Sequence, residues 1–144
     1  MDPANACGLK VAVQATTYED TDEVPAKSKA CTDAGKPAIT IFKFDAQDQA
    51  TNALVVGQVD AMSADSPVTL YAISKTKDKL QTAGDAFEVA PYGIPVAQGS
   101  AFTPVLQKAL QSLIDDGSYT KILAKWGVEA GGVKTAALNV AAKG

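Results

Sequence analysis

The sequence predicts an α/β fold built on a small parallel sheet. Three apolar segments, residues 9–14, 38–44 and 59–64, have the length and side chains of strands, and helical segments separate them. Gly35 and Gly57 stand where the first two helices are expected to end. Strands that alternate with helices form parallel sheets with right-handed crossovers. A chain of 144 residues, 47% of them hydrophobic, is long enough for one domain with a buried core.

The first strand, residues 9–14, is followed by a turn and an acidic run at residues 16–23. Acidic side chains suit the N-terminus of a helix, and this helix is expected to continue to about residue 34. After the second strand, Asp45 is the expected N-cap of the next helix, because an aspartate carboxylate accepts N–H groups of the first helical turn.

The third strand ends at an acid. Val59, Ala61 and Ser63 alternate with their neighbours, and the pair Ser66-Pro67 starts a helix over residues 68–74 with proline in its first turn. Asp65 therefore lies in the turn at the carboxyl end of a strand, where open α/β sheets bind ligands. It is a candidate to hold a cationic group, and a plain turn or capping role is the alternative.

The pattern changes after residue 80. Short extended pieces at residues 80–83, 86–90 and 94–97 surround a break at residues 91–93, and two amphipathic helices follow before a small, polar tail. Ser118 is the expected cap of the last helix. The first apolar stripe consists of Val105, Leu106, Ala109, Leu110, Leu113 and Ile114, and the second of Tyr119, Ile122, Leu123 and Trp126.

Composition disfavours several classes of function. The net charge is −3, which disfavours nucleic acid and anionic membranes as partners. The chain has no histidine and its basic residues are all lysine, so neither metal binding nor catalysis is expected, and the predicted cofactor is none. No apolar run approaches the roughly 18 residues of a spanning helix. The N-terminus has neither the basic nor the apolar segment of a signal peptide. Two alternatives follow: a cytosolic protein, or one whose signal peptide has been removed.

Cys7 and Cys31 precede the first strand and end the first helix, respectively. In a β–α–β unit these two places lie on the same side of the sheet, so we expect a disulfide, which would indicate an oxidising compartment. The alternative is two small buried thiols.

Several motifs together carry a resemblance to a known family. They are LKVAVQ at residues 9–14 with a following threonine pair, GQVDA at 57–61, DSP at 65–67, YGIPV at 92–96 and LQSLIDDGSYTKILAKWG at 110–127. The chain resembles the solute-binding proteins of ABC importers for polar amino acids, the extracellular solute-binding family 3 with the type II periplasmic-binding-protein fold. Its cysteines resemble those of homologues from high-GC Gram-positive bacteria.

The resemblance covers nearly the whole chain but only the C-terminal half of the family's pattern. Such proteins have two α/β lobes that clamp the ligand and are joined by a hinge of two strands. The resemblance implies that residues 8–90 are the second, flavodoxin-like lobe and that 91–99 are the returning hinge strand. Residues 100–130 would be helices of an incomplete first lobe, and 131–144 a tail.

The resemblance also implies residue roles. Asp65 matches the carboxylate that pairs with the ligand's α-ammonium group. Thr16 and Thr17 match the turn whose hydroxyl and backbone N–H groups hold the α-carboxylate, although Ala15 replaces the usual glycine. The implied function is that of a truncated, non-enzymatic amino-acid-binding component, with an ABC permease as partner of the full-length parent. The implied location is extracellular or at the cell surface, with a lipoprotein parent whose signal segment is absent from this chain.

A receiver domain, an enzyme and a scaffold are the alternative functions. A phosphorelay receiver domain needs acids after its first strand, where this chain has Gln14, Ala15 and Thr16. An enzyme built on the binding-protein fold would have only carboxylates and lysines for its chemistry. The main alternative is an isolated lobe that acts as a scaffold without significant ligand binding. The bare apolar stripes would then fold back on the lobe or form a homodimer through the C-terminal helices.

Overall fold

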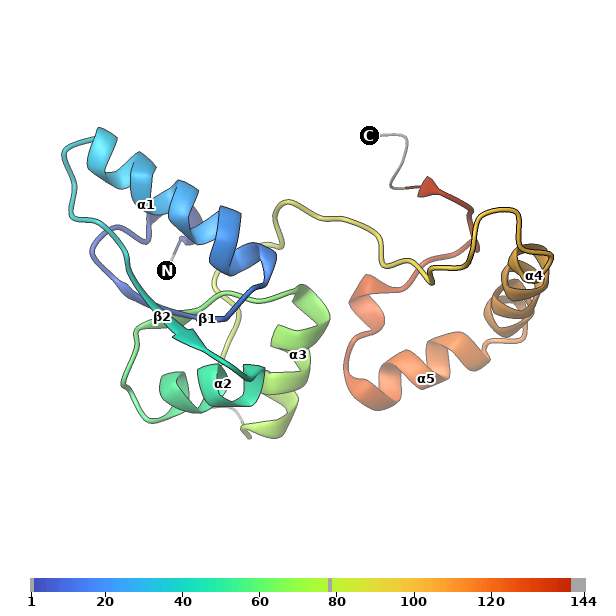
Figure 1. Cartoon of the computed structure of the whole chain (residues 1–144). Coiled ribbons are helices and arrows are strands. Elements are labelled where there is room, and N and C mark those ends of the chain that lie inside the picture. Colours follow the sequence, from blue (N-terminus) through green and yellow to red (C-terminus); the bar gives the residue numbers. More distant parts are fainter. Residues whose placement is uncertain (1, 78, 141–144) are drawn as a thin grey trace. The chain divides into compact units, whose positions relative to one another are not determined.

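The computed structural model describes residues 2–77 and 79–140 of the chain (Figure 1). The chain divides into two compact units, Met1–Asp85 and Ala86–Gly144. The first contains the sheet with its helices, and the second contains two further helices and the tail.

The first unit is built on a three-stranded parallel sheet, as predicted. Its strands are β1 (Lys10–Gln14), β2 (Thr40–Phe44) and β3 (Ala61–Met62), in the order β2-β1-β3. The third strand has only two paired residues and is shorter than predicted. Its pairing with β1 is extended at both ends, because Asp60 N donates to Lys10 O at 2.9 Å and Ser63 N to Ala12 O at 3.0 Å.

Helices cover both faces of the sheet (Figure 1). A π-helical turn, η2 (Glu19–Glu23), leads into α1 (Val24–Asp33), and α2 (Gln47–Val55) and α3 (Ser66–Lys75) follow. Because strand side chains alternate between faces, Val11 and Val13 pack in one core with Val24 and Cys31 of α1. Ala12 points the other way and packs with Ala50 and Ala53 of α2. A short 3₁₀ helix, η1 (Pro3–Asn5), precedes β1.

The helix ends follow the predicted signals in part. Gly35 and Gly57 have φ of +69° and +74° just after the C-caps of α1 and α2, as expected. The prediction that Asp45 caps α2 is wrong, because Ala46 is the N-cap and adopts an extended backbone. Its N–H donates to Gln49 Oε1 at 3.2 Å, so the glutamine satisfies the helix start and Asp45 stays exposed upstream.

The second unit contains α4 (Phe102–Asp115) and α5 (Ser118–Trp126), which pack against each other, and the 3₁₀ helix η3 (Glu129–Gly131). Gly117 joins the two helices with φ of +78°. The expectation that Ser118 is the cap is wrong: its N–H instead donates to Asp116 Oδ1 at 2.8 Å, so the aspartate satisfies the first orphan donor of α5.

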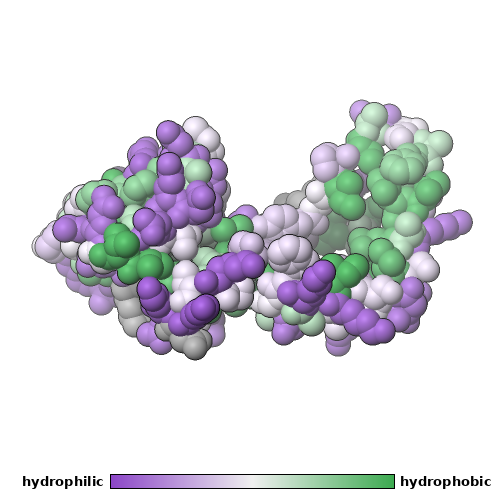
Figure 2. Space-filling view, turned by 90° about the horizontal axis from the view of Figure 1, so that it is seen from below, coloured by the Kyte–Doolittle hydropathy of each residue, from purple (hydrophilic) through white to green (hydrophobic). Residues whose placement is uncertain are grey.

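The second unit leaves much apolar surface exposed. Figure 2 shows hydrophobic residues gathered on the part of the molecule that carries α4 and α5. Val105, Ile122 and Trp126 are about half exposed, and neither helix has a buried residue. The extended pieces between α3 and α4 join no strand of the described sheet.

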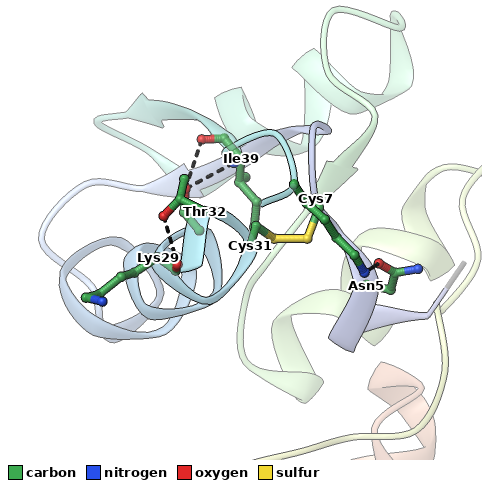
Figure 3. Close-up of a disulfide and its surroundings, with 8 residues drawn as sticks. Asn5, Cys7, Lys29, Cys31, Thr32 and Ile39 are labelled. Carbon is green, nitrogen blue, oxygen red and sulfur yellow. Dashed lines mark hydrogen bonds between the residues drawn. A yellow bond between two sulfur atoms is a disulfide. The ribbon is translucent and has the colours of Figure 1, made fainter. Parts of the chain in front are cut away.

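The predicted disulfide is present. Cys7, in the segment before β1, is bonded to Cys31 of α1 with a Cα–Cα distance of 5.5 Å (Figure 3). About one turn before Cys31 in α1, Ser28 Oγ accepts the N–H of Ile39 at 3.0 Å. The C-terminal part of α1 is therefore fastened both to the segment before β1 and to the residue before β2.

Candidate functional site

The candidate site lies at the carboxyl edge of the sheet. The chain leaves β1 through α1 to reach β2 on one side, and it returns through α2 to β3 on the other side of β1. This reversal makes the β1–β3 boundary the topological switch point, where ligands of open α/β sheets bind. The register pairs Ala12 with Met62, so the segments after β1 and β3 leave this edge side by side. Thr16 and Thr17 lie in the first of these segments and Asp65 in the second.

The turn after β1 has a left-handed residue. Thr16 has a φ of +67°, which a β-branched residue rarely adopts and which costs about 1 kcal/mol or more. Two hydrogen bonds offset this cost. Thr16 N donates to Asp20 Oδ2 at 3.0 Å, and Thr17 Oγ1 donates to Gln14 O at 2.9 Å.

Two other donors of this turn have no acceptor among the described residues. Within residues 2–77 and 79–140, neither the Thr16 hydroxyl nor the Thr17 backbone N–H has a hydrogen-bond acceptor. Both groups stand at the N-terminus of the helix that begins with η2, where the helix dipole favours an anion. The Thr16 N–H and the Thr17 hydroxyl are already engaged and are not among the groups that a ligand would meet.

Asp20 holds the turn in place. Its side chain is 7% exposed, Oδ1 lies 2.6 Å from Lys43 Nζ of β2, and Oδ2 accepts from Thr16. The Lys43 hydrogen bond, with a smaller effect from the Thr16 N–H, lowers the pKa of Asp20 below its ordinary value of 3.8. The sequence was interpreted here only as an acidic helix start. The only signal of this role in the sequence is an acid four residues after Thr16, the first threonine of the pair.

Asp65 stands at the N-cap position of α3. Its backbone oxygen accepts from Thr69 N at 2.9 Å, but its carboxylate makes no capping hydrogen bond to the helix. The residue is exposed. A simple side-chain cap therefore does not account for the acid at this position.

Glu23 and Ser63 join the two turns and were not singled out from the sequence. Ser63 Oγ donates to Glu23 Oε2 at 2.6 Å, and Lys27 Nζ lies 2.7 Å from Glu23 Oε1. The Glu23 side chain is only 5% exposed, so both oxygens of a buried carboxylate have partners. Ser63 lies on the face of the sheet that α1 covers, because it continues the alternation of Ala61.

The chain has relatives among known proteins in both sequence and structure. No protein-family model matches it. It is 42% identical over 139 residues to arginine-binding protein ArgT of Corynebacterium glutamicum, which covers 96% of this chain and 46% of ArgT. It is 33% identical over 91 residues to the ABC transporter glutamine-binding protein GlnH of Bacillus subtilis, covering 62% of this chain and 33% of GlnH.

Two solved structures share the fold. An ancestral arginine-binding protein bound to arginine has a TM-score of 0.63 and 31% identity over 87% of this chain and 53% of that protein. An ancestral arginine-binding protein bound to glutamine has a TM-score of 0.61 and 32% identity over 89% of this chain and 54% of that protein. The chain therefore spans less than half the length of the curated relatives it matches and about half of these structures.

Proposed function

We propose that this chain, which belongs to the amino-acid solute-binding proteins of family 3 as a partial chain, carries one side of an amino-acid site in the binding component of an ABC importer. The observation that carries this proposal is the position of the Thr16–Thr17 turn and Asp65. They flank the switch point of the sheet, one after β1 and the other after β3.

The two half-sites have the chemistry of an α-amino acid. An exposed carboxylate at Asp65 attracts the α-ammonium group. The Thr16 hydroxyl and the Thr17 N–H, at a helix N-terminus, are donors for the α-carboxylate. The sequence has no arginine, so this chain supplies no bidentate carboxylate clamp of its own. The proposed role is binding, without catalysis, metal or cofactor.

Ligand binding by this chain alone is expected to be weak. Exposed ion pairs contribute about 0–1 kcal/mol, and a helix N-terminus adds at most about 1 kcal/mol. A Kd of 1 mM corresponds to about −4 kcal/mol. Without an opposite wall that removes water, we therefore expect a Kd of about 1 mM or weaker.

The test is an NMR titration of the chain with arginine and glutamine, the amino acids in the relatives' names. We expect amide shifts at residues 16–17 and 65 at millimolar ligand, and their loss in Asp65→Asn. Asp45→Asn is the matched control, because Asp45 is an exposed acid at the same edge, after β2 instead of β3. Equal effects of the two variants would contradict the assignment. Micromolar binding by this chain would contradict the expectation of weak binding and show that its own residues form a complete site.

The alternative role is that of a folded, oligomerising scaffold. It is favoured by the exposed apolar residues of α4 and α5, because large exposed apolar patches mark interaction surfaces. The division of the chain that the family resemblance implies is proposed for both roles. Residues 8–90 are the second lobe and 91–99 the hinge strand. Residues 100–130 are first-lobe helices without their sheet, and 131–144 are the tail. A homodimer through α4 and α5 would appear in light scattering after size-exclusion chromatography, and Leu113→Lys would return it to monomer.

The proposed location is outside the cytoplasm, at the surface of the cell, with an ABC permease as partner of the full-length protein. The Cys7–Cys31 disulfide supports this proposal, because such bonds persist in oxidising compartments. Among residues 2–77 and 79–140, every helix is too short or too polar to span a lipid bilayer. A lipoprotein parent would supply the anchor.

A further inference from the structure

We propose that the Glu23–Ser63 hydrogen bond is the positioning link that holds the two half-sites in register, and this inference rests on the function proposed above. Glu23 ends the π-helical turn that begins just after the threonine turn. Ser63 stands two residues before Asp65. The bond of 2.6 Å between Ser63 Oγ and Glu23 Oε2 spans 40 residues of sequence.

The link is continuous on the threonine side. The backbone oxygen of Thr17 accepts from Asp20 N at 3.1 Å and from Thr21 N at 3.0 Å. The π-helical turn carries these residues directly to Glu23. A π-turn inside a helix is often found at functional sites, and this one buries both Asp20 and Glu23. Asp20 then fixes Thr16, and Glu23 fixes the opposite segment.

The link is also continuous on the Asp65 side. Ser63 N is bonded to Ala12 O of β1, which sets the position of the segment after β3. The Asp65 backbone oxygen accepts from Thr69 N and starts α3. Ser63 thus lies between the strand and the N-cap, and its hydroxyl is the group that reaches Glu23 at the end of η2.

Glu23 has a buried carboxylate, so the link requires a partner for each of its two oxygens. A buried carboxylate is tolerated when each oxygen is hydrogen-bonded or paired, and here Ser63 and Lys27 satisfy the two oxygens. Loss of the Ser63 hydroxyl leaves one oxygen unsatisfied, and the N-terminal turn of the helix then loses its tie to β3. Glu23 and Ser63 are positioning residues, because they act on the ligand through the two turns.

The first test needs no ligand. In Ser63→Ala, we expect the amides of Thr16, Asp20 and Thr21 to exchange with solvent at least about threefold faster. Glu23→Gln keeps an acceptor but loses the charge. In this variant we expect the amides of Ser63 and Thr69 to exchange faster, by a factor smaller than the threefold expected for Ser63→Ala. Ser63→Thr retains the hydroxyl and should restore the original rates at the threonine turn.

Ser28→Ala is the matched control. It also removes a serine hydroxyl bond between α1 and the sheet, but near the disulfide end of the helix. It should increase exchange at Ile39 and leave Thr16, Asp20 and Thr21 unchanged. If Ser63→Ala and Ser28→Ala have the same effect on these three amides, the proposed link is wrong, whatever the ligand does.

The second test uses arginine, N-acetylarginine and argininamide in NMR titrations at constant ionic strength. Arginine has both the α-ammonium and the α-carboxylate, and each analogue lacks one of them. A positioning link matters only for a ligand that spans both turns. Ser63→Ala should therefore weaken arginine binding about threefold and leave the two analogues unchanged. Equal weakening of all three would indicate general loss of structure and overturn the link. Absence of any arginine response in the original protein would instead refute the proposed function, and the exchange test would still decide the link.

Discussion

The carboxylate of Asp20 accepts the backbone N–H of Thr16 at 3.0 Å, across the turn that follows the central strand. The other carboxylate oxygen lies 2.6 Å from Lys43 Nζ on the neighbouring strand β2. One buried side chain thus joins a left-handed threonine, the start of a helix and the edge of the sheet. The conformation of the candidate carboxylate-binding turn depends on this acid.

The Asp20 interaction predicts a pH dependence of stability. The folded-state pKa of Asp20 lies below its ordinary value of 3.8, mainly because of Lys43. Its contribution is therefore fully present above about pH 4 and is lost as the pH falls through the folded-state pKa. Asp20→Asn should be less stable than the original protein at pH 7, and the difference should shrink below pH 4. Urea unfolding from pH 7 to pH 3 measures this difference, and a constant difference over that range would contradict the assignment.

Thr16 should show opposed effects on stability and binding. Thr16→Gly removes the cost of a β-branched residue at φ +67°, and we expect a gain of about 0.5–1 kcal/mol in unfolding free energy. The same change removes the hydroxyl proposed to contact the ligand, so the arginine response should fall. Thr16→Ala is the control that loses the hydroxyl without the conformational freedom of glycine. If Thr16→Ala is stabilised as much as Thr16→Gly, backbone strain is not the cause.

The disulfide should stabilise the first unit substantially. It closes a loop with a sequence separation of 24 residues, for which the chain-entropy relation gives about 3.5 kcal/mol. Replacement of both Cys7 and Cys31 by serine should lower the unfolding free energy by about this amount. A reducing agent should have the same effect on the original protein and none on the double variant. An effect of the reducing agent on the double variant would show that it acts elsewhere.

The tail is held by two glutamines of α4. Ala136 N donates to Gln111 Oε1 at 2.9 Å, and Gln107 Nε2 donates to Ala136 O at 2.8 Å, so both backbone groups of a buried residue are satisfied. Gln111→Met removes the acceptor at similar size and should cost about 1 kcal/mol. The amide of Ala136 should then exchange faster. Gln111→Glu keeps an acceptor oxygen and should protect this amide better than methionine does, and equal exchange in both variants would argue against the contact.

Local pattern was sufficient for most of the fold. The alternation of apolar strands and glycine-ended helices predicted the parallel sheet, and the apolar stripes at residues 105–114 and 119–126 fall within α4 and α5. The helix caps were predicted less well. Asp45 and Ser118 are good capping residues by type, but Gln49 and Asp116 provide the bonds. Cap choice depends on side chains that reach back to the helix start, and residue type alone does not decide between neighbours.

The order of elements was predicted from periodicity, the pairing of Cys7 with Cys31 from the expected β–α–β geometry, and the resemblance to the family from contiguous motifs. How the edge of the sheet is held depends on contacts that form only in the folded chain. The π-helical turn buries Asp20 and Glu23, whose partners are distant in sequence: Lys43 lies on β2 and Ser63 just after β3. A pattern of neighbouring residues cannot specify a contact across 40 residues, because that contact exists only once three strands have paired in the order β2-β1-β3.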